Sequence, residues 1–151
     1  MRGRKKDSRV VRGNALVEFA LSASIMLPAL IGMMQFGFSF LTYSKLAIAM
    51  RQGARYAALR TYDSSTATPS AAFATAVQNM VVYSNPNGGT TPIVRGLTTN
   101  QVVVTTSMYN GVPDMITVRL VSFEIDAAVA KITLTGKPWA TYRYQGRFAP
   151  P

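Results

Sequence analysis

One carboxylate stands at the start of a long uncharged segment. Glu18 lies five positions after Gly13, and the next charged residue is Lys45. An acid near a helix N-terminus is favoured by the helix dipole, by about 0.3 to 1 kcal/mol when exposed. In a low-dielectric helix bundle an unpaired amine would cost several kcal/mol, so an acid there can also serve as its partner. The chemistry expected of Glu18 is therefore ion pairing, and a plain helix-end charge is the simpler alternative.

Other reactive side chains are scarce. The chain has no His and no Cys, which excludes Ser-His-Asp triads, Cys-His dyads and the usual zinc sites. Glu124 and Asp126 would share one face of a strand, where they could bind a cation or act as a glycosidase pair. Two carboxylates without further ligands are more often surface charges. We therefore expect no enzyme activity, no cofactor and no metal, and keep a membrane-tethered hydrolase as a remote alternative.

The net charge of +10 is concentrated at the N-terminus. Basic residues flanking an apolar span favour the cytoplasmic side, which predicts that the N-terminus stays inside. Nucleic-acid binding is disfavoured because no aromatic residues interleave these charges. One acid, Asp7, accompanies the six basic residues that precede Gly13: Arg2, Arg4, Lys5, Lys6, Arg9 and Arg12.

The segment from Phe19 to Leu41 is predicted to span a membrane. As a helix it would rise about 34 Å, against about 30 Å of hydrocarbon. Pro28 removes one backbone hydrogen bond and predicts a bend, while Gly32 and Gly37 would permit close approach of another helix. A cleaved signal peptide ending near residues 47–49 is the rival interpretation, but its apolar core would be too long.

Helical spacing continues beyond this span to about Arg60. Leu46, Met50, Gly53 and Ala57 recur at steps of four, three and four. This stripe needs a cover, either the chain's own domain or neighbouring chains. The basic residues Arg51, Arg55 and Arg60 lie mostly elsewhere, as solvated surface or as contacts to lipid headgroups or acidic partner surfaces.

The remaining sequence predicts a small domain. Ser70 can cap a helix over Ala71 to Val82, and residues 85–89 end it. Alternating apolar residues predict a hairpin, which turns around residues 110–114, and two further strands, while residues 124–129 fit a strand or a helical turn equally well. The predicted strands are 102–109, 115–123, 130–135 and 139–144.

These elements define the expected architecture. The fold class is α+β, with a long N-terminal transmembrane helix extending into a domain that holds a second helix and a short antiparallel sheet. The expected divisions are a basic leader (1–13), the helix (14–60) and an extracytoplasmic domain (61–151). Near its end, Tyr142, Arg143, Tyr144, Arg147 and Phe148 mix aromatic and basic character, which suits an edge strand better than a site for single-stranded nucleic acid or polysaccharide.

The sequence around Glu18 resembles a known processing signal. Residues 13–19, Gly-Asn-Ala-Leu-Val-Glu-Phe, follow a basic leader and precede the span, as in the class III leader of type IV pilins. The resemblance implies cleavage by a prepilin peptidase after Gly13, so that Asn14 becomes the N-terminus. It also implies that Glu18, the fifth mature residue, followed by Phe19, guides assembly by pairing with a neighbour's amine.

A narrower resemblance covers the first 60 residues. Ala-Leu-Val-Glu-Phe-Ala-Leu, the Gln-Phe-Gly of 35–37 and Arg-Gln-Gly-Ala-Arg-Tyr-Ala-Ala-Leu-Arg-Thr look like TadE-like proteins, minor pilins or pseudopilins of the Flp (tight-adherence) type IV pilus. The segment 78–86 and the C-terminal Tyr-Gln-Gly-Arg-Phe-Ala-Pro are also similar to what such proteins carry. The added domain, which the major Flp pilin lacks, indicates a minor component.

This resemblance sets the functional expectations. It implies a structural subunit for pilus biogenesis, adhesion and biofilm formation, with the prepilin peptidase, other pilin or pseudopilin subunits, the pilus assembly machinery and membrane lipid as partners. The expected location is the bacterial inner membrane, single-pass, with the N-terminus inside and the domain outside. An unprocessed, single-span anchored binding or scaffold module is the alternative.

Overall fold

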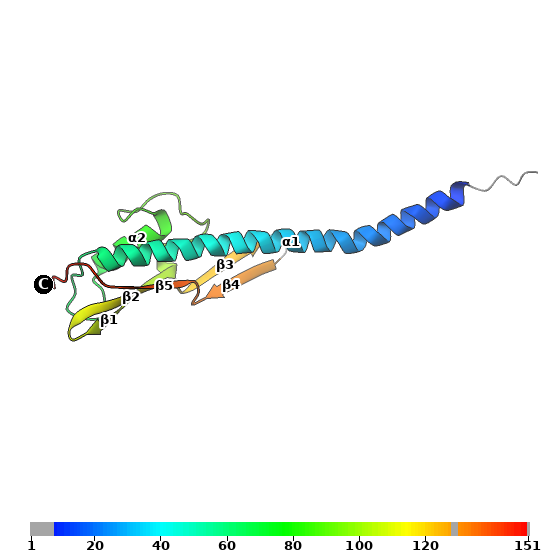
Figure 1. Cartoon of the computed structure of the whole chain (residues 1–151). Coiled ribbons are helices and arrows are strands. Elements are labelled where there is room, and N and C mark those ends of the chain that lie inside the picture. Colours follow the sequence, from blue (N-terminus) through cyan, green and yellow to red (C-terminus); the bar gives the residue numbers. More distant parts are fainter. Residues whose placement is uncertain (1–7, 128–129, 151) are drawn as a thin grey trace, which may run out of the picture. The chain divides into compact units, whose positions relative to one another are not determined.

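The computed structural model describes residues 8–127 and 130–150 (Figure 1). The chain divides into two compact units, residues 1–38 and residues 39–151. Helix α1, Ser8–Leu59, begins in the first unit and ends in the second. The fold is α+β, with a long apolar N-terminal helix, a second helix and antiparallel sheets, as the sequence predicts.

The described part of the first unit is helical throughout. Its large apolar side chains are exposed, with Phe19 at 72%, Ile25 at 75% and Met34 at 80%. Pro28 lies inside the helix. The segment Asn14–Leu59 is long and apolar enough to cross a membrane, so this unit has the composition of a membrane anchor.

The second unit combines the end of α1 with a helix and five strands (Figure 1). Helix α2, Ala71–Tyr83, starts where Ser70 accepts a hydrogen bond from the Phe73 backbone N–H at 3.1 Å, as predicted. A 3₁₀ turn, η1, covers Thr99–Gln101. The strands are β1 Val102–Tyr109, β2 Val112–Leu120, β3 Ser122–Ala127, β4 Ala130–Thr135 and β5 Trp139–Arg143.

The strands form two separate antiparallel sheets. One has the order β1-β2-β5, and the other pairs β3 with β4. Side chains alternate between buried and exposed, as for Ile116, Val118 and Leu120 in β2, which are fully buried. The inward-facing residues of β1, β2 and β5 therefore join α1 and α2 in one core.

One predicted strand and one predicted turn were wrong. The segment expected as one strand, 115–123, belongs to two, because β2 starts at Val112 and ends at Leu120 while Phe123 belongs to β3. The turn is shorter than expected because Asn110 (φ 51°) and Gly111 (φ 77°) close it with two left-handed residues. Pro113 then fits inside the strand beside a bulge at 107/108.

The apolar stripe of α1 is covered by the chain's own domain. Leu46, Met50, Ala54 and Ala57 are fully buried in the core. A Cβ added to Gly53 would collide with the Val81 side chain, so the glycine permits close packing of α1 on α2. Of the two covers that the pattern allowed, the structure therefore shows the intramolecular one.

The segment after β5 returns to the end of α1, and we call residues 144–149 the clasp. Gln145 N–H donates to the Ala58 carbonyl at 2.9 Å, and the Tyr144 hydroxyl lies 2.9 Å from the Arg60 carbonyl. Tyr62 is fully buried, and its backbone forms an isolated parallel β-bridge with Phe148. The clasp thereby satisfies carbonyl groups that a helix C-terminus leaves free.

Candidate functional site

The residues around Glu18 lie on consecutive turns of α1. Gly13, Asn14, Glu18 and Phe19 are all helical, and the last three are exposed. Asn14 and Glu18 are four residues apart, so they share one face of the helix. No ion pair of Glu18 is found within the described residues. An exposed carboxylate of this kind is accessible to a cation from outside the chain.

The peptide bond between Gly13 and Asn14 lies five residues after the helix begins at Ser8. A protease acts on extended backbone, so cleavage here requires this end of the helix to open. Helix ends open at low free-energy cost. The helical state is therefore compatible with cleavage.

The basic residues of the N-terminal segment divide into two groups. Arg9 and Arg12 belong to the first turns of α1. The positions Arg2, Arg4, Lys5 and Lys6 lie outside the described residues. Two of the six basic residues expected to set the membrane topology are therefore part of helix α1.

Gly32 and Gly37 differ from Gly53 in their surroundings. A Cβ placed on either would meet no atom of the chain within 4 Å, whereas Gly53 is packed against Val81. The small residues of the first unit therefore are not needed for packing within the described chain. They leave backbone surface open to an approaching helix.

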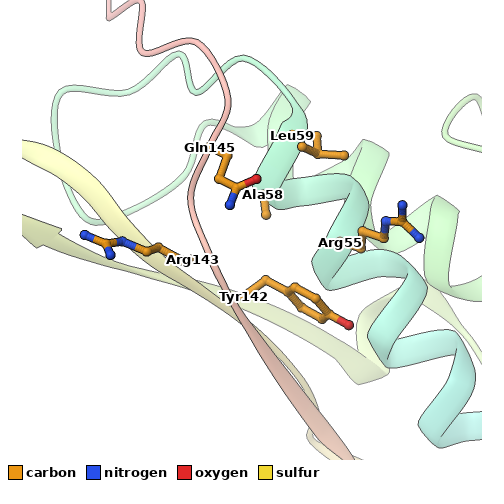
Figure 2. A pocket seen from close by; sticks show the side chains of 6 residues that line it. All are labelled: Arg55, Ala58, Leu59, Tyr142, Arg143 and Gln145. Atoms are coloured by element: carbon orange, nitrogen blue, oxygen red, sulfur yellow. The ribbon is translucent and has the colours of Figure 1, made fainter.

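A pocket of about 380 Å³ lies between the end of α1 and β5 (Figure 2). Figure 2 shows the Tyr142 ring beside the Arg55 turn of α1, while the Arg143 side chain points away from the helix. The pocket is bordered by Ala58, Leu59 and Gln145 as well. Its lining is mainly apolar, and Figure 2 shows no charged group directed into it, which is too little to define a ligand.

The basic residues at the end of α1 do not act together. Arg60 donates from Nη1 to the Tyr56 hydroxyl at 2.6 Å, with its guanidinium 5.8 Å from that ring centre. Arg51 and Arg55 are exposed. Arg60 is therefore held within the fold, and Arg51 and Arg55 remain available to solvent or to partners.

The predicted carboxylate pair lies on the exposed side of β3. Glu124 Oε1 accepts a hydrogen bond from Lys131 Nζ at 2.7 Å across the β3–β4 pair. That bond, with the charges of Glu124 and Asp126, raises the pKa of Lys131 above its usual value. Among the described residues no group of three or more His, Cys, Asp or Glu could hold a metal ion. This arrangement is that of a surface ion pair.

The aromatic and basic run near the C-terminus does not form one surface. Tyr142 and Arg143 point to opposite sides of β5 (Figure 2). Tyr144 and Phe148 are partly buried against the core. The centre of the Tyr144 ring lies 6.1 Å from the centre of the Tyr62 ring, and that of the Phe148 ring lies 6.4 Å from it. Burial is the main reason that the pKa of Tyr144 is raised. The run is thus an edge strand followed by the clasp.

The sequence did not single out Trp139 as an exposed residue, although the structure shows that it is one. Its side chain is 59% exposed at the start of β5, directly opposite Arg119 of β2. The alternation of Trp139 and Thr141 with buried Ala140 was the signal that could have placed it on a solvent-facing side.

Comparison with known proteins identifies the N-terminal part of the chain. Residues 13–55 match the family described as TadE-like protein. The match covers the segment that starts at the predicted cleavage site and continues into the buried part of α1, and it agrees with the resemblance found there in the sequence. No curated protein and no solved structure matches the chain.

Proposed function

From the premise that this chain carries a TadE-like N-terminal segment, we propose that it is a minor pilin-like subunit of a Flp-type (Tad) pilus. The observation that carries the proposal is the match over residues 13–55 together with the exposure of the apolar side chains around Glu18. A structural, non-enzymatic role is typical of this family. Under this proposal the subunit contributes to pilus biogenesis, adhesion and biofilm formation.

The proposed life cycle begins in the cytoplasmic membrane. The basic leader stays inside, residues 19–41 cross the bilayer, and the second unit faces outward. A prepilin peptidase cuts after Gly13, which creates an α-ammonium group on Asn14. The exposed carboxylate of Glu18 then pairs with the amine of a neighbouring subunit, because both charges would be costly to bury alone in lipid.

Lateral packing of α1 supplies the remaining contacts in this proposal. The open backbone at Gly32 and Gly37 allows another helix to approach closely, and the exposed apolar side chains of residues 14–38 supply contact area. The other pilus subunits and the assembly machinery are the partners. The folded second unit, with its own core, is carried along as an outward-facing domain.

Mass spectrometry of the N-terminus tests the processing step. Chain purified from the native host should begin at Asn14, and chain from a strain lacking the peptidase should retain residues 1–13. Retention of the leader beside an active peptidase would contradict the proposal. It would favour the alternative function, an uncut membrane-anchored binding module.

Substitution of Glu18 tests assembly separately. Glu18→Ala should leave membrane insertion unchanged and abolish or strongly reduce incorporation into pili, measured by immunoblot of sheared filaments. Glu124→Ala, which removes an exposed acid from the second unit, is the matched control and should assemble normally. Normal piliation of the Glu18 variant would exclude the pairing role.

A further inference from the structure

The side of the three-stranded sheet that points away from the core carries an unusual set of side chains. We define the outer face by six of them, on β1, β2 and β5: Thr105, Thr117, Arg119, Trp139, Thr141 and Arg143. Five of them lie beside buried residues at outward positions of their strands, and Arg143 shares the side of Trp139 and Thr141 because it follows them at steps of two. The outer face therefore combines two arginines and an exposed indole with a set of hydroxyl groups.

Pairing across the strands arranges these residues in rows. Arg119 lies opposite Trp139, and Thr117 opposite Thr141. In β1, Thr105 is the partner of Thr117, so the middle row consists of three threonines. Arg143 continues β5 four residues after Trp139, about 13 Å along the strand. The surface therefore offers an aromatic ring beside one guanidinium at one end, hydroxyl groups in the middle and a second guanidinium at the other end.

The exposure of Trp139 is not explained by packing. An indole that is 59% exposed leaves a large apolar surface in water, although the same strand buries Ala140. Tyr109 at the hairpin end of the sheet is 70% exposed as well. Exposed aromatic groups with a polar surround are typical of binding surfaces.

The polar groups of the outer face keep hydrogen-bonding capacity. The Thr117 and Thr141 hydroxyls lie 2.7 Å apart, so one donates to the other and the second hydrogen remains for another acceptor. Arg119 has no ion pair within the described residues. Arg143 lies 3.6 Å from Asp114 through Nε, and its side chain is 79% exposed, so its terminal nitrogens remain accessible.

We propose that the outer face binds an acidic polysaccharide, a polymer of sugar rings bearing carboxylates. The indole of Trp139 would stack on the apolar face of a sugar ring, and the threonine hydroxyls would bond to sugar hydroxyls. Arg119 and Arg143 would each form paired hydrogen bonds with a carboxylate. The distance from Trp139 to Arg143 allows contact with more than one ring of a chain.

Charge density favours a polysaccharide over nucleic acid. A single-stranded nucleic acid carries a phosphate at every nucleotide and is bound in grooves lined by many cations. The outer face has two arginines, one of them beside Asp114, together with a hydroxyl row that matches sugar chemistry. Binding requires only a folded domain. The inference rests on the proposed function only in that the proposed topology puts this face outside the cell.

Trp139 is the single tryptophan of the chain, so its fluorescence reports directly on the outer face. The full chain in nanodiscs of zwitterionic lipid is titrated with polygalacturonate, with neutral dextran and with oligothymidylate. We expect polygalacturonate to quench and shift the emission, with an affinity that falls as salt rises, because the carboxylate contacts are screened. Dextran should cause little change, and oligothymidylate should bind more weakly.

Variants assign the binding to the face. With labelled polygalacturonate, Trp139→Ala should weaken binding by about tenfold, as expected for loss of one stacked ring. Arg119→Gln and Arg143→Gln should each weaken it several-fold and reduce its dependence on salt. Tyr142→Ala, on the opposite side of the same strand, is the matched control and should bind as the unchanged chain does.

The outcomes that overturn the proposal are distinct. They are the absence of any polygalacturonate binding, binding that survives all three outer-face substitutions, equal binding of dextran, and tighter binding of oligothymidylate. Circular dichroism verifies that each variant is folded, and Trp139→Phe replaces the alanine variant if the latter unfolds. None of these measurements depends on processing after Gly13 or on pilus assembly, so the two proposals can fail separately.

Discussion

The two halves of α1 are built from similar apolar residues and have opposite surroundings. In residues 14–38 side chains such as Leu30 are largely exposed, whereas in residues 39–59 Leu46 and Met50 are fully buried. The difference arises because α2 and the sheet, which are encoded later in the chain, cover only the second half. Hydropathy therefore locates an apolar helix but does not tell which part of it is covered by lipid and which by protein.

Leucine truncation in the two halves should give the largest contrast. Leu46→Ala removes a fully buried side chain and should lower the free energy of unfolding of the second unit by about 2–5 kcal/mol. Urea unfolding in mild detergent, followed by Trp139 fluorescence, measures the loss. Leu30→Ala, in the exposed half, should change it by less than about 0.5 kcal/mol. Equal losses would refute the division of α1.

Glycine substitution should repeat the contrast on a smaller scale. Gly53→Val forces a side chain against Val81 and should cost the second unit about 1–3 kcal/mol. Gly37→Val meets no atom within 4 Å and should leave the unfolding midpoint unchanged. If the Gly53 variant unfolds at the same urea concentration as the unchanged chain, α1 and α2 do not pack as closely as described.

The clasp provides a third test at the C-terminal end of α1. Tyr144→Phe removes a hydroxyl that accepts from the Tyr62 N–H and lies 2.9 Å from the Arg60 carbonyl, and should cost about 0.5–1.5 kcal/mol. Burial raises the pKa of Tyr144, so its folded state holds the proton more strongly than the unfolded chain does. Its stability contribution is therefore complete below the unfolded pKa of about 10 and is lost as pH rises through the folded pKa.

The pH dependence distinguishes this hydroxyl from a general loss of packing. Unfolding curves at neutral and alkaline pH should show a smaller alkaline loss for Tyr144→Phe than for the unchanged chain. Tyr142→Phe serves as control, since its ring borders the open pocket. The same alkaline loss in all three chains would mean that Tyr144 is not the group involved.

The smallest effect is expected at the ion pair on the second sheet. Lys131→Ala should leave the unfolding midpoint unchanged at neutral pH, because both charges are exposed to solvent. Because the pKa of Lys131 is raised, any contribution of its charge to the stability of the fold is complete at neutral pH. That contribution would begin to be lost only as pH rises above about 10.5. A clear shift of the neutral midpoint would show that the β3–β4 pair is held by charge as well as by its apolar face.

Local patterns predicted much of the second unit. The bounds of β1 and β4, and the Ser70 cap of α2, result from β-propensity, alternation and capping chemistry, which act over a few residues. The start of β2 could not be predicted in this way, because Pro113 is acceptable in a strand only beside an irregularity of the ladder, and here the β1–β2 register shifts so that Asp114 of β2 has no Cα partner. That bulge depends on pairing, which a single strand does not reveal.

The candidate functional residues also divide into those that local sequence predicts and those that only the sheet brings together. The motif around Glu18 is contiguous, so the sequence alone could identify it. The outer face joins β2 to β5, from Arg119 to Trp139, and only the sheet register brings them together. The mixed run at 142–148 was predicted to be an edge strand, and β5 confirms this for residues 142 and 143, whose side chains point to different sides because they are neighbours along a strand.

The clasp also imposes an order on biosynthesis. Its contact between Tyr144 and Arg60 joins positions 84 residues apart. A ribosome synthesises the apolar helix long before the residues that complete the aromatic cluster around Tyr62. Until then the core of the second unit is incomplete, and its apolar residues are open to aggregation.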